Sequence, residues 1–264
     1  MLRHESEFNG YAIGASDGQL GTVVDLLFDD ASWVVRWLVV DTGKWLSGRK
    51  VLLPPSVLGS VNHIGHQFAV RLTTQQVKDS PNIDTERPVS RQMESSIYDH
   101  FGWNPYWGDG VYMGGYGYMG GYGYTGGAMR GSAFRASRRR EQDIVDAQRE
   151  NDDPHLRSIK EVTGYHIHAT DGEIGHVEDF LVEDADWSIH YLVVDTKNWW
   201  PAKKVLISPR SAERINWAKK LVNLNVDRER VKGSPAYDGS TTIDQEYENH
   251  FHKYYGDVRA SDPV

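Results

Sequence analysis

The chain of 264 residues contains no cysteine. This absence excludes disulfide bonds, zinc–thiolate sites, thiol nucleophiles and cysteine-held iron–sulfur clusters. No apolar run approaches the roughly 20 residues that a helix needs to cross a bilayer. The first ten residues are polar and acidic, without the apolar core of a signal peptide. We therefore expect a protein of the cytoplasm that does not insert into a membrane.

An excess of positive charge is also missing. Lys and Arg total 29 against 37 Asp and Glu, which gives a formal net charge of −8. Residues 1–87 carry 8 basic and 10 acidic side chains, and residues 164–264 carry 12 and 17, so these segments have net charges of −2 and −5. Because like charges repel, this balance disfavours binding to nucleic acid or to an anionic membrane surface.

One unit occurs twice in the sequence. The first copy begins at Gly10 with GYAIGASDGQLGTVVDLLFDD, and the second begins at Gly164 with GYHIHATDGEIGHVEDFLVED. The offset of 154 holds without a gap, and 29 of the 75 positions from residue 10 to residue 84 are identical. Such self-similarity indicates two copies of one small domain. We predict domains at 1–87 and 164–238, a connecting region at 88–163 and a C-terminal tail at 239–264.

Each unit is predicted to be all-β with a helical tail. Short apolar or alternating segments are separated by turns such as Ser16-Asp17-Gly18. In the first copy we expect strands at 11–15, 21–28, 34–40, 50–53, 57–61 and 67–72, and the second copy repeats them. An open sheet of short strands would leave its edges and apolar residues exposed. We therefore expect each unit to close into a small barrel. The residues expected in the cores include Leu38, Val40, Leu192 and Val194.

Helices are expected after each barrel. Short helical turns are predicted at 74–78 and 228–232, each stopped by a Ser-Pro dipeptide. Longer helices are predicted around 89–101 and 242–254. Their ends resemble each other, since 97–101 reads IYDHF and 247–251 reads YENHF.

The region between the copies has a different composition. Eleven of the 24 residues at 108–131 are Gly and five are Tyr. Glycine at this density costs backbone entropy on folding, so we expect a flexible linker that packs little against either barrel. Residues 137–150 (SRRREQDIVDAQRE) are predicted to form a charged helix.

Both copies resemble the PRC-barrel domain. The resemblance rests on the Asp-Gly turn with its following Gly-x-Val, on the Leu-Val-Val-Asp-Thr strand, and on the strand R-K-V-L at residues 49–52. The family is named for the cytoplasmic part of the H subunit of the photosynthetic reaction centre, and it also occurs in a ribosome maturation factor. The resemblance implies small β-barrels, often in dimers, that act as adaptor surfaces without catalysis.

Two functions of those relatives do not transfer to this chain. The reaction-centre subunit has an N-terminal transmembrane helix, and the ribosome factor pairs its barrel with a different domain; this sequence shows neither. The leading hypothesis is a self-associating protein-interaction module. The alternative is an auxiliary subunit or assembly factor of a photosynthetic or electron-transfer membrane complex, associated peripherally. A ribosome-associated role is disfavoured by the acidic charge.

Aromatic and basic side chains are the candidate interaction residues. Tryptophan-rich surfaces often carry interface energy, and equivalent basic pairs stand near tryptophans in both copies. Alternatively, these basic side chains lie on a strand face where they are solvated or form salt bridges. The interaction candidates are Trp33, Trp37, Trp45, Arg49, Lys50, Phe101, Trp187, Trp199, Trp200, Lys203, Lys204 and Phe251.

Four histidines are weak metal candidates. His166 and His168 leave the same face of one predicted strand, and His176 and His190 lie on the next two strands. The first copy has Ala12, Gly14, Thr22 and Arg36 at these positions. No spacing signature supports a site, so we predict no metal or cofactor. No GxSxG, phosphate-loop or HExxH motif is present, so we predict no enzymatic activity.

The two barrels are expected to pair with each other. A barrel of about 75 residues buries a limited core and gains stability by docking its apolar surface. Two copies of one domain present similar surfaces, which allows a pseudo-twofold contact. The sequence leaves open whether the barrels pair within one chain or in a homodimer, and it names no protein partner.

Overall fold

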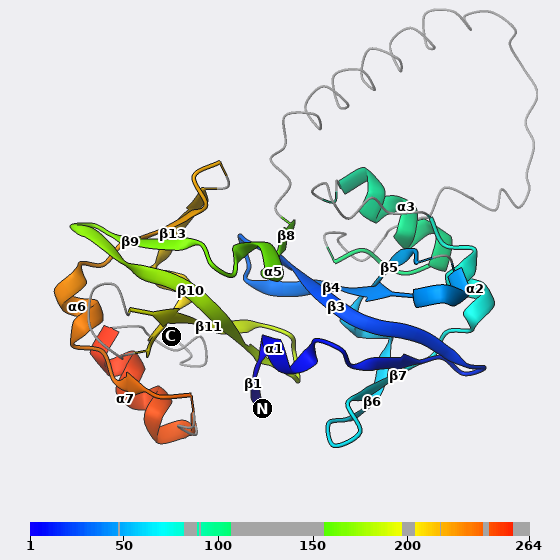
Figure 1. The fold of residues 1–264 in the computed structure, drawn as a ribbon, viewed down its shortest axis with the longest axis horizontal. Helices are drawn as coiled ribbons and strands as arrows, with labels where there is room; N and C mark the ends of the chain where they lie inside the picture. The colour runs from blue at the N-terminus through cyan, green and yellow to red at the C-terminus, as the bar shows by residue number, and fades with distance from the viewer. Residues whose placement is uncertain are drawn as a thin grey trace, which may run out of the picture.

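The computed structural model describes residues 1–46, 48–81, 89, 91–106, 156–196, 204–216, 218–239 and 243–255. Two β-sheets with a few helices make up this part of the molecule, one in each half (Figure 1). The predicted linker at 108–131 and the predicted charged helix at 137–150 lie outside the described residues. No helix among the described residues is long and apolar enough to cross a bilayer.

The first sheet has the strand order β5-β4-β3-β2-β7-β6. All neighbours are antiparallel except β2 and β7, which are parallel. The strands are β2 (Ala12–Gly14), β3 (Gln19–Asp29), β4 (Val34–Asp41), β5 (Lys50–Leu53), β6 (Leu58–Asn62) and β7 (Gln67–Val70). The helical segments of this half are η1 (Gly43–Leu46), η2 (Pro55–Val57), α2 (Thr74–Lys78) and α3 (Arg91–Phe101).

The second sheet repeats this order with β12-β11-β10-β9-β14-β13 and adds β15 beside β12. Its strands are β9 (His166–Ala169), β10 (Gly172–Glu183), β11 (Ile189–Asp195), β12 (Lys204–Ile207), β13 (Ala212–Asn216), β14 (Leu221–Leu224) and β15 (Ala236–Tyr237). The helical segments are η3 (Pro209–Ser211), α6 (Arg228–Lys232) and α7 (Gln245–Tyr255). The bounds of α2 and α6 match the two helical turns predicted from sequence.

The expected closure of each sheet into a barrel is wrong. The end strands of the first sheet, β5 and β6, are not paired with each other among the described residues, and the same holds for β12 and β13. One reason is local: β5 and β6 are joined by η2, which follows Pro54 and begins at Pro55, and proline has no N–H to donate to a ladder. In addition, β3 and β10 take partners from the opposite half.

Those additional partners are two short N-terminal arms that the halves exchange (Figure 1). The first arm is β1 (Leu2–His4) and α1 (Glu5–Phe8), and β1 pairs with β10 of the second half. The second arm is β8 (Leu156–Ser158) and α5 (Ile159–Val162), and β8 pairs with β3 of the first half. The bounds of the two arms differ by 154 residues, the offset of the sequence repeat. The exchange is therefore reciprocal, as in a pseudo-twofold dimer.

Side-chain contacts hold each arm at equivalent points. Arg3 Nε lies 3.3 Å from Asp184 Oδ2, and Arg157 Nε lies 2.6 Å from Asp30 Oδ2. Arg157 is 3% exposed, so its ion pair is shielded from solvent. Each arginine thereby attaches its arm to an aspartate in the turn that follows the strand with which the arm pairs.

A second pair of aspartates anchors the beginning of each short helix. Asp179 accepts hydrogen bonds from Ser6 Oγ at 2.6 Å and from the Ser6 backbone N–H at 3.3 Å. At the equivalent place, Asp25 accepts from Ser158 Oγ at 2.6 Å and from the Lys160 N–H at 3.1 Å. Burial raises the pKa of Asp25, although these hydrogen bonds act in the opposite direction.

The two sheets also meet directly at equivalent turns. Val35 N–H donates to Trp187 O at 2.9 Å, and Ile189 N–H donates to Trp33 O at 2.8 Å, around an isolated bridge between Val34 and Ser188. Trp33 and Trp187 both have positive φ, 55° and 63°. Because non-glycine residues rarely adopt this conformation, its presence at both turns marks the junction as a built feature of the fold.

One apolar cluster runs through both halves. It contains Leu38 and Val40 from β4 together with Leu192 and Val194 from β11, all four fully buried as predicted. A smaller apolar cluster lies beneath α3 and another beneath α7.

The helices α3 and α7 are related by the offset of 154, which corrects one sequence interpretation. The similar IYDHF and YENHF ends differ by 150 residues and do not occupy equivalent positions. Ile97, 1% exposed, is instead the counterpart of Phe251, 0% exposed. The two helices thus share a buried apolar residue at the same position, where the helix faces the sheet.

Candidate binding groove

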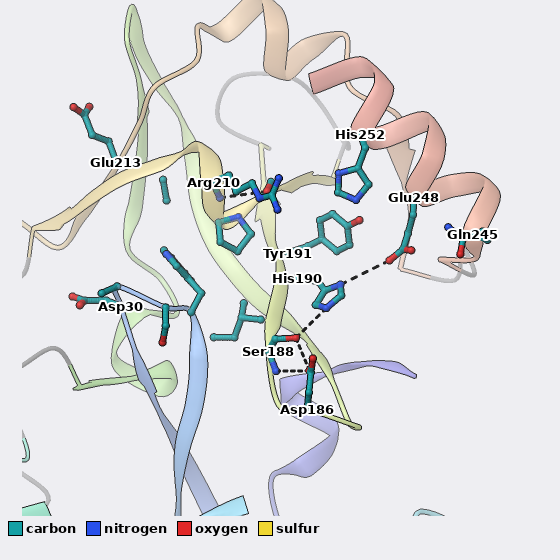
Figure 2. A pocket seen from close by; sticks show the side chains of 17 residues that line it. Asp30, Asp186, Ser188, His190, Tyr191, Arg210, Glu213, Gln245, Glu248 and His252 are labelled. Atoms are coloured by element: carbon teal, nitrogen blue, oxygen red, sulfur yellow. Dashed lines mark hydrogen bonds and ion pairs between the residues drawn. The ribbon is translucent and has the colours of Figure 1, made fainter. Parts of the chain in front are cut away.

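A groove of about 950 Å³ lies where the two halves meet (Figure 2). The first half contributes the turn from Asp30 to Trp33 between β3 and β4. The second half contributes the start of β11, the segment around η3 and one face of α7. Because the exchanged arms fix the turn of one half against the sheet of the other, the groove has walls from both halves.

The wall from α7 carries Gln245, Glu248 and His252, which are three and four residues apart and therefore share one helix face. These side chains face His190 and Tyr191 of β11 (Figure 2). Tyr191 is 1% exposed and packs edge-on against Phe251, with ring centroids 4.9 Å apart. The buried Tyr191–Phe251 pair thus holds α7 against β11 and sets the width of the groove at this point.

A chain of polar contacts crosses the groove (Figure 2). His190 Nε2 lies 3.0 Å from Ser188 Oγ, and Ser188 donates from both its hydroxyl and its N–H to Asp186 Oδ1 at 2.6 and 2.9 Å. His190 Nδ1 lies 3.8 Å from Glu248 Oε1. Burial by itself raises the pKa of Asp186, but the hydrogen bonds from Ser188 and the nearby His190 outweigh it and lower that pKa below its usual value.

Carboxylates predominate among the charged groups of the groove. Asp30, Asp186, Glu213 and Glu248 stand against the single guanidinium of Arg210 and the imidazoles of His190 and His252. Carboxylate oxygens accept hydrogen bonds, so the lining suits a binding partner that presents hydroxyl or N–H donors. A phosphorylated partner would meet repulsion from these carboxylates.

The four predicted tryptophans that the structure describes do not gather in one patch. Trp33 and Trp187 lie at the junction of the halves, and only Trp33 borders the groove. Trp37 is fully buried beneath α3 and donates from Nε1 to Glu94 at 2.7 Å. Trp45 is 41% exposed and donates to Leu20 O at 2.6 Å. Trp199 and Trp200 lie outside the described residues.

Two of the predicted basic candidates, Arg49 and Lys204, have local partners. Arg49 donates to the carbonyl oxygens of Lys78, the last residue of α2, and of Ser80 and Pro81 just after it. Lys204 Nζ lies 2.7 Å from Glu178 Oε1, whereas Lys50 is exposed and Lys203 lies outside the described residues.

The two phenylalanines take part in aromatic packing. Phe101 stacks on Trp103, with ring centroids 4.2 Å apart, and Phe251 lies on the buried face of α7 and packs against Tyr191.

The four histidines do not converge. His166 and His176 are opposite each other on β9 and β10, but His166 Nδ1 pairs with Glu173 at 2.7 Å. His168 contacts the carbonyl of Ala169 at 3.0 Å, and His190 lies in the groove. Within the described part of the chain, no three His, Asp or Glu side chains form a group that could hold a metal ion.

Sequence reasoning missed most of the groove. Glu248, His252 and Arg210 were not singled out, because no motif marks them. The signal was present in the repeat. Within residues 10–84 the offset of 154 places Tyr191 on Trp37, and carried past residue 84 it places Glu248 on Glu94. The comparison of equivalent positions would have drawn attention to this helix face.

Comparison with known proteins gives two findings. The sequence model of the PRC-barrel domain matches residues 6–76. An uncharacterised protein of Deinococcus radiodurans is 34% identical over 82 residues, which are 31% of this chain and 29% of that protein. The chain thus matches less than a third of that relative's length. Neither finding points to a photosynthetic or ribosomal complex.

Proposed function

We propose that the chain is a non-enzymatic protein-interaction module built from two PRC-barrel units, the first of which contains residues 6–76, the segment that the sequence model of this domain matches. The second unit is residues 156–238, whose sheet has the same strand order as the first. The 29 identities at a constant offset support the assignment of both units to one domain type. The two units pair within one chain, and the body so formed binds another protein.

The observation that carries this proposal is the groove between the units. Its walls come from both halves, and the exchanged arms and the turn–turn hydrogen bonds fix them against each other. Preorganised walls lower the entropic cost of binding. The lining mixes apolar surface from Ala31, Trp33 and Pro209 with hydrogen-bond acceptors, as protein interfaces do.

The test is capture of binding partners by the intact chain, compared with a variant altered only in the groove. We expect Glu213→Lys with His252→Ala to reduce capture of specific partners at least about tenfold, because it reverses one wall charge and removes one contact. Lys44→Ala, on an exposed side chain of η1 away from the groove, is the matched control. Partners identified by mass spectrometry are then titrated with the purified proteins by calorimetry.

Two results would reject the proposal. One is equal capture by the groove variant and the control for every partner. The other is turnover of a small-molecule substrate by the purified chain that is lost in the groove variant, which would identify the groove as a catalytic site.

A further inference from the structure

The first half shows what occupies the place that is a groove in the second half. Tyr106 follows α3 and lies over β4. The guanidinium carbon of Arg36 lies 4.1 Å from the centroid of its ring, and the Tyr106 hydroxyl lies 3.2 and 3.4 Å from the two carboxylate oxygens of Glu94. Its ring also lies 6.5 Å from that of Tyr98. A tyrosine thus fits between the strand and the helix.

The three partners of Tyr106 have direct counterparts in the groove. Adding 154 converts Arg36, Glu94 and Tyr98 into His190, Glu248 and His252. All three counterparts line the groove, with Glu248 and His252 on one face of α7 and His190 on β11 opposite them (Figure 2). The helices that carry them have equivalent bounds, Arg91–Phe101 and Gln245–Tyr255, so the correspondence is structural as well as sequential.

The sequence of the second copy provides no tyrosine for this place. The positions equivalent to Trp103 and Tyr106 are Asp257 and Ala260. Trp103 stacks on Phe101 in the first half, so the second copy lacks both aromatic side chains of the segment that covers α3. The second copy thus keeps the carboxylate of this site as Glu248, has His190 and His252 in place of Arg36 and Tyr98, and has no tyrosine at the position of Tyr106.

We propose that the groove is a receptor for a tyrosine side chain carried by a short segment of a partner protein. This inference rests on the proposed function and names the chemistry that the groove recognises. The ring lies beside His190, where Arg36 covers the ring of Tyr106, and the hydroxyl donates to Glu248. Arg210 and Glu213 border the neighbouring part of the groove and contact the backbone on either side of the tyrosine.

The lining distinguishes tyrosine from its close relatives. Phenylalanine fits the same space but leaves Glu248 without the donated hydrogen bond. Phosphotyrosine would place a dianion among Asp30, Asp186, Glu213 and Glu248, where like charges repel it. Unmodified tyrosine is therefore the preferred occupant.

The experiment uses the intact chain and a capped peptide with the sequence of residues 101–106, Phe-Gly-Trp-Asn-Pro-Tyr. Binding is followed by NMR of the imidazole protons of His190 and His252, assigned by single His→Ala variants. We expect the peptide to shift these signals, and a Tyr106→Phe peptide to bind about tenfold more weakly, because a hydrogen bond to a carboxylate is lost. A Tyr106→Ala peptide should leave the signals unchanged.

Two protein variants make the test specific. Glu248→Gln should weaken the tyrosine peptide severalfold and leave the phenylalanine peptide unaffected. His190→Arg should strengthen binding of the tyrosine peptide about two- to fivefold, because it restores the cation that lies over Tyr106 in the first half. His166→Ala, an exposed histidine on β9, is the matched control and should change neither.

Three outcomes would overturn the inference. The first is equal binding of the tyrosine and phenylalanine peptides. The second is no shift of the His190 or His252 signals while partner capture still depends on the groove, which would leave the proposed function standing. The third is peptide binding only after the five tyrosines between residues 108 and 131 are changed to serine, which would make the chain itself the occupant.

Discussion

Gly21 and Gly175 are the residues at which the two sheets leave least room for a side chain. A Cβ on Gly21 would lie 2.0 Å from the carbonyl oxygen of Asp41, and one on Gly175 would lie 1.9 Å from that of Asp195. Both glycines have positive φ, 155° and 154°. The Gly-x-Val pattern that carried the family resemblance therefore reflects a close approach between β3 and β4, and between β10 and β11.

Replacing Gly175 with alanine should destabilise the protein by about 1–3 kcal/mol, because the new methyl group meets backbone atoms that cannot rotate away. Gly18→Ala is the matched control, since a Cβ there meets only a methyl group of Thr74 at 3.5 Å. Urea unfolding measures both. Equal free energies of unfolding for the two variants would show that the strands can separate at little cost.

His4 and Glu5 make attachment of the first arm dependent on pH. The hydrogen bond to Asp179 and the charge of that aspartate raise the pKa of His4. Burial, together with the charges of Asp179 and Asp25, raises the pKa of Glu5 to about 8. Both groups hold a proton more tightly in the folded protein than in the unfolded chain.

Stability should therefore fall as pH rises. The His4 contribution is fully present below its unfolded pKa of 6.5 and is lost as pH passes its folded pKa, and the Glu5 contribution is lost between pH 4.5 and about 8. Asp179 has a lowered pKa, so its contribution is lost only in acid. We expect a lower free energy of unfolding at pH 9 than at pH 6, and a smaller difference in Glu5→Gln and in His4→Ser, which copies the equivalent Ser158. Parallel pH profiles for the parent and both variants would contradict this assignment.

At the scale of elements, the arms fill the core as well as extending the sheets. Phe8, the last residue of α1, is fully buried, and its ring lies 5.3 Å from that of Trp187 in the second half and 5.9 Å from that of Phe68 in the first. Val162, the last residue of α5, occupies the equivalent place and is also fully buried. Each short helix thus inserts one apolar side chain at the junction.

Phe8→Ala should cost about 3–5 kcal/mol of unfolding free energy, the usual penalty for removing a buried aromatic ring. Glu7→Ala on the same short helix removes only a partly exposed ion pair with Arg3 and should cost less than about 1 kcal/mol. Calorimetric melting of the two variants distinguishes the loss of stability caused by an unfilled core from the loss caused by a change in helix propensity. A Phe8→Ala protein as stable as Glu7→Ala would mean that α1 does not contribute to the core.

The sequence predicted the strands of both halves because half-buried strands alternate and central strands are continuously apolar. It did not predict the arms. Their seven residues, LRHESEF and LRSIKEV, share Leu, Arg and Glu at the offset of 154, but strands of three residues show no periodicity. The pattern of a strand indicates which of its faces is buried, but it does not indicate which strands pair. Closure into a barrel was therefore expected, whereas the end strands β5 and β6 do not pair with each other and β3 and β10 each pair with an arm of the opposite half. The groove was missed for the same reason, since its walls come from elements distant in sequence.

At the scale of the whole molecule, the reciprocal arms mean that neither half has all its strands within its own sequence. The end of β3, Leu27–Asp29, pairs with β8, and Leu181–Glu183 of β10 pairs with β1. A half produced alone would leave these backbone groups and the junction around Trp33 and Trp187 facing water. Unpaired strand edges and exposed apolar surface favour association. The arrangement resembles a domain-swapped dimer contained in one chain.

We therefore expect residues 1–106 and 156–264, produced as two separate chains in one cell, to form a one-to-one complex. Each fragment supplies the arm that the other lacks, so the pair regains the ladders β1–β10 and β3–β8 and the two ion pairs Arg3–Asp184 and Arg157–Asp30. Size-exclusion chromatography with light scattering measures the mass of the complex. Removing residues 1–8 from the first fragment should weaken the complex at least about tenfold, because one ladder and the Phe8 contact are lost. Two fragments that elute as folded monomers, with or without residues 1–8, would show that the arms do not hold the halves together.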